Sequence, residues 1–346
     1  MITIKKIAKL ANISVGTVDR ILHNRGQVSQ GNIDTVNAII KEFGYKRNIY
    51  ASNLAFNKKF RFAVLLPKFE DIEYWEAPFK GIKKAAEEFE RFGVKIDYYY
   101  YKYSSTSFKK MAQKVLTQEF DGLLFSPVFY DESVIFLNEC KKKNIPIVMI
   151  DSNIKEVEGL AYIGQDAYQS GFLGGKLISF GIPIPNHVLI MKITREIEST
   201  SVYLQRIKGF YSFFKENPEL SNFNFSEISI KDSESNRLTK KMFEGINGVF
   251  VPNSRVHFVA KFIKENKVKN IRVVGYDLLK QNLEYLNEGY IDFLINQKPE
   301  DQGYLGINYL YKKLVLKEEV EITNYMPLEI IVKENAISSK DIKNTI

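Results

Sequence analysis

Apolar positions near the start of the chain recur every three or four residues, which predicts a run of short amphipathic helices. The first covers about 4–11 and the second about 15–23. Thr3 and Ser14 stand just before them, where a side-chain oxygen can accept an otherwise unpaired backbone N–H. A third helix opens at Ser29. Two short helices joined by a tight turn cannot bury a core alone, so the three together predict a helix-turn-helix, whose second helix is of the kind that enters the DNA major groove.

From residue 61 onward, apolar runs of strand length alternate with longer amphipathic stretches. The predicted strands lie at 62–67, 94–101, 122–127, 146–151, 187–193, 223–230, 248–253, 271–277, 292–297 and 320–332. The predicted helices lie at 77–92, 107–118, 131–143, 167–180, 203–216, 235–245, 255–266, 279–288 and 299–316. Because these strands lack polar alternation and are separated by helices, they predict parallel sheets covered on both faces, and so an α/β core.

About ten strands are many for one doubly wound sheet, so we expect two lobes, each with its own sheet. The expected parts are a helix-turn-helix domain at 1–46, a hinge or linker at 47–60, a first lobe at about 61–162 with 299–325, and a second lobe at about 163–298 with 326–346. In the linker, the stretch 48–55 has the composition for two helical turns. So short a helix is marginal in water and tends to order only against a partner.

The positive charge of the chain is confined to its beginning. Residues 1–61 carry eleven Lys or Arg and three acidic residues, a net charge of +8 that equals the net charge of the whole chain. A neutral body with a basic head is the electrostatic footprint of a nucleic-acid-binding protein. The alternative is a solvated basic surface with no partner, which the coinciding helix-turn-helix pattern disfavours.

Several predicted strands of the core end in polar residues, namely Asp151, Asn253, Asp277 and Gln297. In open parallel sheets, ligands bind outside the carboxyl ends of the strands. Carboxylates and amides can bond adjacent hydroxyl groups, so this set suits a small polyhydroxy ligand. The alternative for any one of these residues is that it caps its strand end.

Other functional classes find little support in the sequence. None of the three histidines (His23, His187 and His257) has a companion at metal-ligand spacing, so we expect no metal. The glycines at 171–176 do not have P-loop spacing, and no G-x-S-x-G motif occurs, so we expect neither an enzyme nor a cofactor. The single cysteine, Cys140, suits a reducing cytoplasm, and no apolar run or signal-peptide pattern predicts a membrane span or export.

The head and core together resemble the lac repressor family of bacterial transcription regulators. In the head, the resemblance rests on IKKIAKLANISVGTVDRILHNRGQVS, on the later Phe-Gly-Tyr, and on NIYASNLA at 48–55. The core is similar to ribose-binding, periplasmic-binding-protein-like domains. The matching segments are IGQDAYQSG (163–171), QRIKGF (205–210), VFVPN (249–253), VVGYD (273–277) and INQKPEDQG (295–303). The resemblance implies a homodimer in which each subunit presents one helix-turn-helix to a pseudo-palindromic operator in double-stranded DNA.

The resemblance also implies which residues of the head touch DNA. Val15, Gly16 and Arg20 occupy the base-reading positions, and Arg20 can bond a guanine bidentately. Asp19 either orients Arg20 or faces solvent. The plausible phosphate contacts are Thr17, Asn24, Arg25 and Ser29.

In the linker, 48–55 matches the hinge helix of the family, with Asn48, Ala51 and Leu54 on DNA. Leu54 matches the leucine that inserts between base pairs in the minor groove. The alternative is that Leu54 packs onto the core.

In the core, the ligand residues of the family map onto Asp151, Arg206, Asn253, Asp277 and Gln297, with aromatic residues at Tyr74 and Trp75. Trp75 is the only tryptophan, and its alternative role is ordinary packing. We expect a sugar or sugar-like effector, although Ser152 and Asn153 follow Asp151 where ribose-type proteins have an arginine.

These expectations combine into a ligand-responsive repressor in which a bound effector controls operator binding allosterically. The alternative is a sugar-binding transport or sensor protein of the same core fold.

Overall fold

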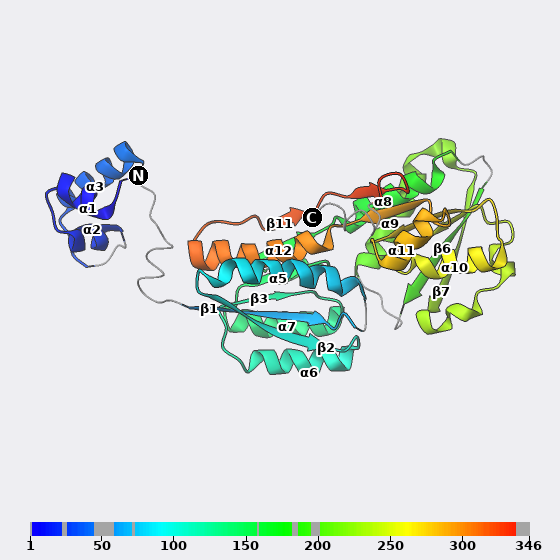
Figure 1. The fold of residues 1–346 in the computed structure, drawn as a ribbon, viewed down its shortest axis with the longest axis horizontal. Helices are drawn as coiled ribbons and strands as arrows, with labels where there is room; N and C mark the ends of the chain where they lie inside the picture. The colour runs from blue at the N-terminus through cyan, green and yellow to red at the C-terminus, as the bar shows by residue number, and fades with distance from the viewer. Residues whose placement is uncertain are drawn as a thin grey trace, which may run out of the picture. The chain divides into compact units, whose positions relative to one another are not determined.

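The computed structural model describes residues 2–22, 26–44, 59–70, 73–157, 159–181, 186–194 and 201–336 (Figure 1). The chain forms two compact units, Met1–Lys58 and Lys59–Ile346. The predicted fold class is confirmed: a helical N-terminal unit precedes an α/β core with two sheets of mostly parallel strands. Among the described residues, no helix is both long enough and apolar enough to span a membrane.

The N-terminal unit contains the three predicted helices, α1 (Ile4–Leu10), α2 (Val15–Leu22) and α3 (Gln30–Phe43). The predicted caps hold: Thr3 Oγ1 accepts the Lys6 N–H at 3.3 Å, and Ser14 Oγ accepts the Thr17 N–H at 3.0 Å. Gly44 ends α3 in the left-handed region, at a φ of 59°. The helices share one small core made of Ile7, Ala8, Val18, Ile21 and Val36.

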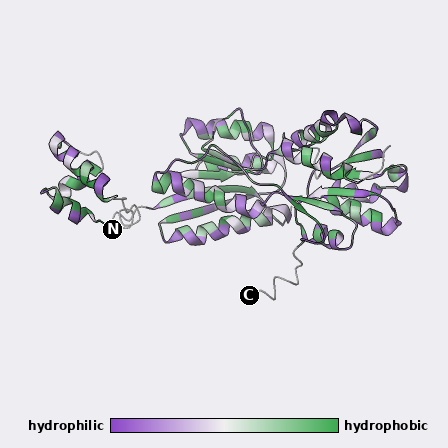
Figure 2. Ribbon diagram, turned by 90° about the horizontal axis from the view of Figure 1, so that it is seen from above, coloured by the Kyte–Doolittle hydropathy of each residue, from purple (hydrophilic) through white to green (hydrophobic). Residues whose placement is uncertain are grey.

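The first lobe of the core is a six-stranded sheet in which every pair of neighbours is parallel. In sheet order its strands are β11 (Thr323–Tyr325), β5 (Ala161–Gly164), β4 (Ile147–Ile150), β3 (Gly122–Phe125), β1 (Phe60–Pro67) and β2 (Val94–Tyr101). Its helices are α5 (Glu76–Glu90), α6 (Ser105–Leu116), α7 (Tyr130–Lys142) and α12 (Pro299–Leu310). The central strands are completely buried, and Figure 2 shows apolar strands inside and polar outer faces on the helices.

The second lobe repeats this strand order and differs in the direction of one edge strand. Its strands are β12 (Glu329–Ile331), β10 (Phe293–Asn296), β9 (Arg272–Tyr276), β8 (Gly248–Phe250), β6 (Asn186–Thr194) and β7 (Phe223–Lys231). Its helices are α8 (Ala167–Ser179), α9 (Ser201–Glu216), α10 (Val256–Asn266) and α11 (Lys280–Asn287). All neighbours are parallel except β12, which runs antiparallel to β10.

Each lobe contains one helix pair whose backbones approach closely at glycines. In the first lobe, α12 lies against α5 (Figure 1), and a Cβ on Gly81 would stand 1.8 Å from the Glu300 carbonyl oxygen. In the second lobe, α8 lies against α9, and a Cβ on Gly171 would stand 1.8 Å from the Arg206 carbonyl oxygen. Any side chain at these glycines would push the helices apart, so Gly171, and Gly175 with its Cβ position 2.8 Å from Phe213, serve the packing of α8 on α9.

Three local predictions were wrong. The strand β5 was missed because its four residues are too few to give a periodic pattern. The helix predicted at 235–245 is instead two 3₁₀ segments, Asp232–Arg237 and Lys240–Phe243, in a stretch whose Ser and Asn side chains compete for backbone hydrogen bonds. The long strand predicted at 320–332 is two short strands, one in each lobe, because Pro327 separates β11 from β12.

Candidate ligand site and nucleic-acid interface

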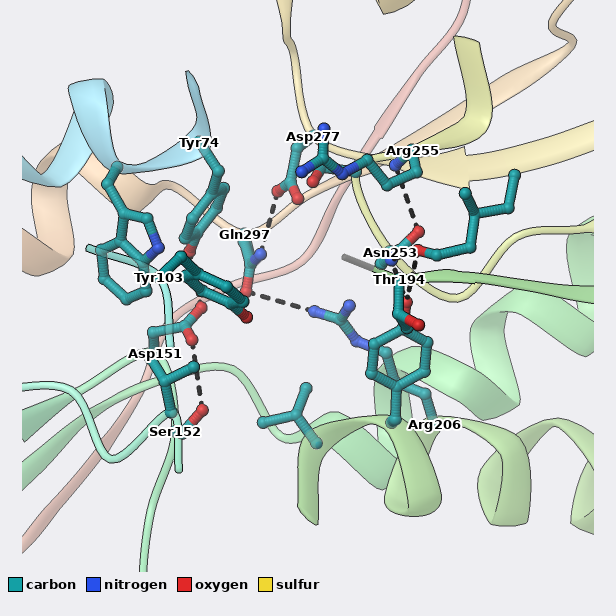
Figure 3. A pocket seen from close by; sticks show the side chains of 16 residues that line it. Tyr74, Tyr103, Asp151, Ser152, Thr194, Arg206, Asn253, Arg255, Asp277 and Gln297 are labelled. Atoms are coloured by element: carbon teal, nitrogen blue, oxygen red, sulfur yellow. Dashed lines mark hydrogen bonds between the residues drawn. The ribbon is translucent and has the colours of Figure 1, made fainter. Parts of the chain in front are cut away.

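All of the ligand residues predicted from the sequence line a single cavity of about 110 Å³ between the two lobes, here called the inner cavity. Figure 3 shows Tyr74, Asp151 and Ser152 on one side, from the first lobe, and Arg206 and Asn253 on the other, from the second. The predicted members are Tyr74, Trp75, Asp151, Arg206, Asn253, Asp277 and Gln297. The other lining residues are Tyr103, Val128, Ser152, Ile193, Thr194, Val202, Tyr203, Ser254 and Arg255.

Asp151 stands directly after β4 with its backbone in the left-handed region, at a φ of 66°. Its N–H donates to Gln302 Oε1 at 2.9 Å, which fixes the turn. Both carboxylate oxygens have hydroxyl donors, Tyr74 Oη at 2.6 Å and Ser152 Oγ at 3.2 Å. Burial raises the pKa of Asp151, and the Tyr74 hydrogen bond is the largest effect in the opposite direction.

Asp277 stands directly after β9, also left-handed, at a φ of 67°. Gln297 Nε2 donates to its Oδ1 at 2.9 Å. Burial raises the pKa of Asp277 to about 7, although the positive charge of Arg206 acts to lower it. No hydrogen bond from the described residues reaches Oδ2, so this oxygen can take a ligand hydroxyl.

Arg206 lies on α9 and is only 4% exposed. Its Nη1 donates to the Pro252 carbonyl at 2.8 Å, its Nη2 donates to Gln297 Oε1 at 3.3 Å, and its guanidinium stacks on the Tyr276 ring at 3.9 Å. Its Nε is buried without a hydrogen-bond partner in the described part of the chain. An orphaned buried donor beside a cavity is costly unless a ligand or water accepts from it, which makes Arg206 a candidate ligand donor.

The aromatic residues form the apolar walls of the inner cavity. Tyr74 and Trp75 lie in the 3₁₀ segment η1 (Glu73–Trp75) and meet edge to face, with ring centroids 5.2 Å apart. Trp75 is 3% exposed, so it both packs into the first lobe and lines the cavity. Flat apolar faces between hydrogen-bonding edges match the chemistry of a sugar ring.

Asn253 uses its amide within the protein. Its Nδ2 donates to the Ile193 carbonyl at 2.7 Å and also to Tyr203 Oη, and its Oδ1 accepts the Arg255 N–H at 3.1 Å. Asn253 therefore ties together the strand ends of the second lobe, in agreement with the capping alternative, while still lining the cavity.

Sequence reasoning missed several lining residues that carried a usable signal. Thr194 is the last residue of β6, and so is another polar strand end. Tyr203 lies three residues before Arg206 on α9, which places both on one helix face. Arg255 follows Asn253 by two residues and pairs with Asp232 at 3.4 Å, so it brings a compensated charge to the cavity. In the described part of the chain, no cluster of His, Cys, Asp or Glu could hold a metal ion.

In the N-terminal unit, the predicted base-reading residues lie on α2. Val15 is 45% exposed at the first position of the helix, Gly16 and Arg20 are also exposed, and Val18 and Ile21 face the core. Thr17 Oγ1 is 2.8 Å from Ser14 Oγ, and Ser29 precedes α3 without a side-chain cap bond. The predicted contacts at Asn24, Arg25, Asn48, Ala51 and Leu54 lie outside the described residues.

Two family descriptions match the chain: "Bacterial regulatory proteins, lacI family" over residues 3–48 and "Periplasmic binding protein domain" over 62–318. The sucrose operon repressor of Streptococcus mutans is 23% identical over 89% of this chain and 91% of its own. Catabolite control protein B of Bacillus subtilis is 23% identical over 90% of this chain and 99% of its own.

Solved structures agree with these matches. A crystal structure described as a LacI transcriptional regulator from Bacteroides fragilis superimposes with a TM-score of 0.75 and 29% identity, over 80% of this chain and 98% of that one. The core fold is shared with GanP, a glucose-galactose binding protein from Geobacillus stearothermophilus, with a TM-score of 0.69 and 23% identity over 80% and 99% of the two chains. The match of the head to the regulator family favours a transcription regulator over the transport alternative. This chain belongs to the lacI family of bacterial regulatory proteins, and its core is a periplasmic binding protein domain.

Proposed function

We propose that this transcription regulator acts as a homodimeric repressor whose operator binding is controlled by a small sugar or sugar-like effector held in the inner cavity. The observation that carries the proposal is the convergence of strand-end polar residues from both lobes on one cavity with aromatic walls. A ligand bridging the lobes binds better when they are closed, and so shifts the population toward the closed state. Any coupling of that shift to the heads is reciprocal, so operator DNA also changes effector affinity.

The chemistry of the inner cavity supports a polyhydroxy effector. Asp277 offers an acceptor oxygen and Arg206 an unpaired N–H, both buried, so a ligand bonding both would relieve two desolvated groups. The names of similar proteins point the same way: sucrose for one repressor, glucose and galactose for GanP, and D-allose in the solved complex of a transporter binding protein. Serine at position 152, in place of arginine, argues against ribose.

An uncovered edge of the first lobe supports the homodimer. β2 is the last strand of its sheet and carries half-buried tyrosines, including Tyr98 and Tyr100, whose rings stack at 6.0 Å. Phe79 of α5 meets both rings, and Phe69 stacks on Phe79 at 5.3 Å. An aromatic strip along a free strand edge is a surface that a second copy can cover. Size-exclusion chromatography with light scattering tests the proposed dimer.

We assign the reading of DNA to α2 and to the hinge. Arg20 donates to a guanine, Val15 contacts a thymine methyl group, and Gly16 allows close approach, so direct readout is sparse. Much of the specificity then falls to DNA deformation at the wedge residue Leu54. Arg20→Ala is expected to cost about 1–3 kcal/mol in operator binding and to relax specificity at one base pair. Arg91→Ala, on the core, is the matched control and should leave operator affinity unchanged.

The hinge assignment has its own test. Leu54→Ala should weaken operator binding strongly while leaving effector affinity unchanged, because the wedge touches only DNA. Gel-shift titrations on the operator, paired with effector titrations, separate the two effects. Unchanged operator affinity would rule out the wedge.

The effector assignment is tested by a thermal-shift and fluorescence screen with D-glucose, D-galactose, sucrose, D-allose, D-tagatose and D-arabinose. Because Trp75 is the only tryptophan and lines the inner cavity, binding should change its emission and raise the melting temperature together. If none of these sugars alters either signal, the proposal of a carbohydrate effector is wrong.

A further inference from the structure

A second and larger cavity, of about 780 Å³, lies between the lobes and is here called the outer cavity. Tyr74 and Asp277 line both cavities, so these side chains form the wall between them. From the first lobe the outer cavity is lined by η1 and the start of α5, and from the second by residues 277–281 and the rest of α11. The stretch 277–281 therefore begins at the inner cavity and runs along the outer one.

This stretch, here called the latch segment, crosses to the opposite lobe at two points. Leu279 packs against the hydrophobic core cluster of the first lobe. Gln281 Nε2 donates to Glu73 Oε1 at 3.1 Å, which joins α11 to η1. The other amide atom, Gln281 Oε1, is buried without a partner in the described part of the chain. Glu73 is thus the partner that holds this side chain across the cleft.

The latch segment in the second lobe and its partner Glu73 in the first lobe are both joined closely to residues of the inner cavity. In the second lobe, Asn282 Nδ2 donates to the carbonyls of Asp277, Tyr276 and Ser254, each at 3.0 Å, so the latch segment moves with Asp277. In the first lobe, Glu73 directly precedes Tyr74, whose hydroxyl donates to Asp151. A movement of Asp277 is therefore transmitted to the latch segment through the Asn282 side chain. A movement of Asp151 is transmitted to Glu73 through Tyr74.

We propose that Leu279, Gln281 and Glu73 form a latch that holds the two lobes closed and so positions Asp277 opposite Asp151. This inference rests on the proposed function for its consequence: effector affinity is set partly by residues that touch no effector. If the closed state is only partly populated, apparent affinity falls in proportion to its fraction. Breaking the latch lowers that fraction, and a stronger latch raises it.

The experiment uses the full-length protein without any ligand, so that its outcome does not depend on the effector. Acrylamide quenching of Trp75 reports opening, because that side chain is 3% exposed in the closed lobes. Spin labels at Lys110→Cys in α6 and Lys261→Cys in α10 report the distance between the lobes. Cys140 stays unlabelled because it is buried and its pKa is raised to about 12.

The variants form a charge series at one position. Gln281→Glu places like charges across the cleft and should raise the quenching constant about two- to ten-fold and add a longer interlobe distance. Gln281→Lys creates an ion pair with Glu73 and should lower the quenching constant and favour the shorter interlobe distance. The double variant Glu73→Lys with Gln281→Glu exchanges the two charges of the Gln281→Lys ion pair and should therefore match Gln281→Lys rather than Gln281→Glu.

Asn287→Asp is the matched control, because it adds the same charge to the same helix and the same outer cavity away from Glu73. Circular dichroism checks that each variant is folded. Equal quenching and equal distances across the whole series would overturn the latch, whether or not any sugar binds. A missing response to every sugar, with the latch series behaving as expected, would instead count against the proposed function alone.

Discussion

The two lobes of the core place a carboxylate at the same point of the same strand order. Asp151 follows β4 and Asp277 follows β9, each one strand away from a short strand that is followed by a glutamine, Gln165 after β5 and Gln297 after β10. Both aspartates are left-handed, at φ values of 66° and 67°. Both donate their backbone N–H to the neighbouring strand, at 3.3 Å and 3.1 Å. The two aspartates therefore have the same backbone conformation and the same kind of backbone hydrogen bond.

Their side-chain surroundings differ. Asp151 receives two hydroxyl donors, one on each oxygen, whereas Asp277 receives one amide donor; the positive charge of Arg206 acts to lower the pKa of both carboxyl groups. Both groups are buried and both have raised pKa values, that of Asp277 reaching about 7. A repeated scaffold can thus hold one acid satisfied by its own lobe and another whose second oxygen is left for a ligand. We therefore propose that Asp151 mainly supports the structure of the site and that Asp277 mainly binds the effector.

Replacement of Asp277 should have the largest effect on effector binding and so tests the proposed difference between the two acids most directly. Asp277→Ala should abolish the response of operator binding to effector, with at least about a hundred-fold loss of effector affinity, because a hydrogen bond in a buried site is lost and its ligand partner is left unpaired. Operator binding without effector should persist, since the head is a separate compact unit. Gel-shift titrations with and without the sugar that responds in the thermal screen measure both quantities. A fully responsive variant would refute the assignment.

The second prediction concerns pH and separates the two acids by their protonation. Asp277 holds its proton in the folded protein up to about pH 7, whereas an unfolded aspartate loses it near pH 4. Between these values the folded state binds more protons, so this group makes stability fall as pH rises, by a few kcal/mol in total at about 1.4 kcal/mol per unit. Urea melts from pH 4 to 8 should show this fall in the parent protein relative to Asp277→Asn. Parallel curves for the two proteins would contradict the assignment.

The two acids also show how much of the fold and of the site could be predicted from the sequence. Polar residues after apolar strands predicted Asp151, Asp277 and Gln297 as cavity residues, because parallel strands present their carboxyl ends at one edge. The helix period predicted the head and its caps at Thr3 and Ser14. Sequence patterns missed what depends on contacts between distant segments: the four-residue β5, the hydroxyl of Tyr74 on Asp151, and the crossing from Gln281 to Glu73. The similar sequences at these two strand ends do not show which hydrogen-bond donors from distant segments lie beside each carboxylate.

A smaller effect is expected at the first-lobe acid. Asp151→Asn keeps the size of the side chain but presents an NH₂ group to donors on at least one side, where Tyr74 and Ser152 now donate. We expect about a ten-fold loss of effector affinity, which is about 1.4 kcal/mol and clearly less than the loss at Asp277. Fluorescence titration of Trp75 measures it. Equal losses at the two acids would remove the proposed division of roles.

The smallest and most specific change is Tyr74→Phe, which removes one hydroxyl and leaves the aromatic wall in place. Asp151 Oδ1 then loses its donor at 2.6 Å while staying buried, which should cost about 1–3 kcal/mol of stability. Because that hydrogen bond opposes the raised pKa of Asp151, its loss should raise the pKa further, so the cost should be largest where Asp151 is ionised and should shrink as the solution is acidified. Tyr103→Phe, on the same cavity wall, is the control for hydroxyl loss as such. If Tyr74→Phe and Tyr103→Phe show the same dependence on pH, the hydroxyl of Tyr74 does not distinguish the first-lobe acid, and the difference between the two acids has to come from the Gln297 donor on Asp277.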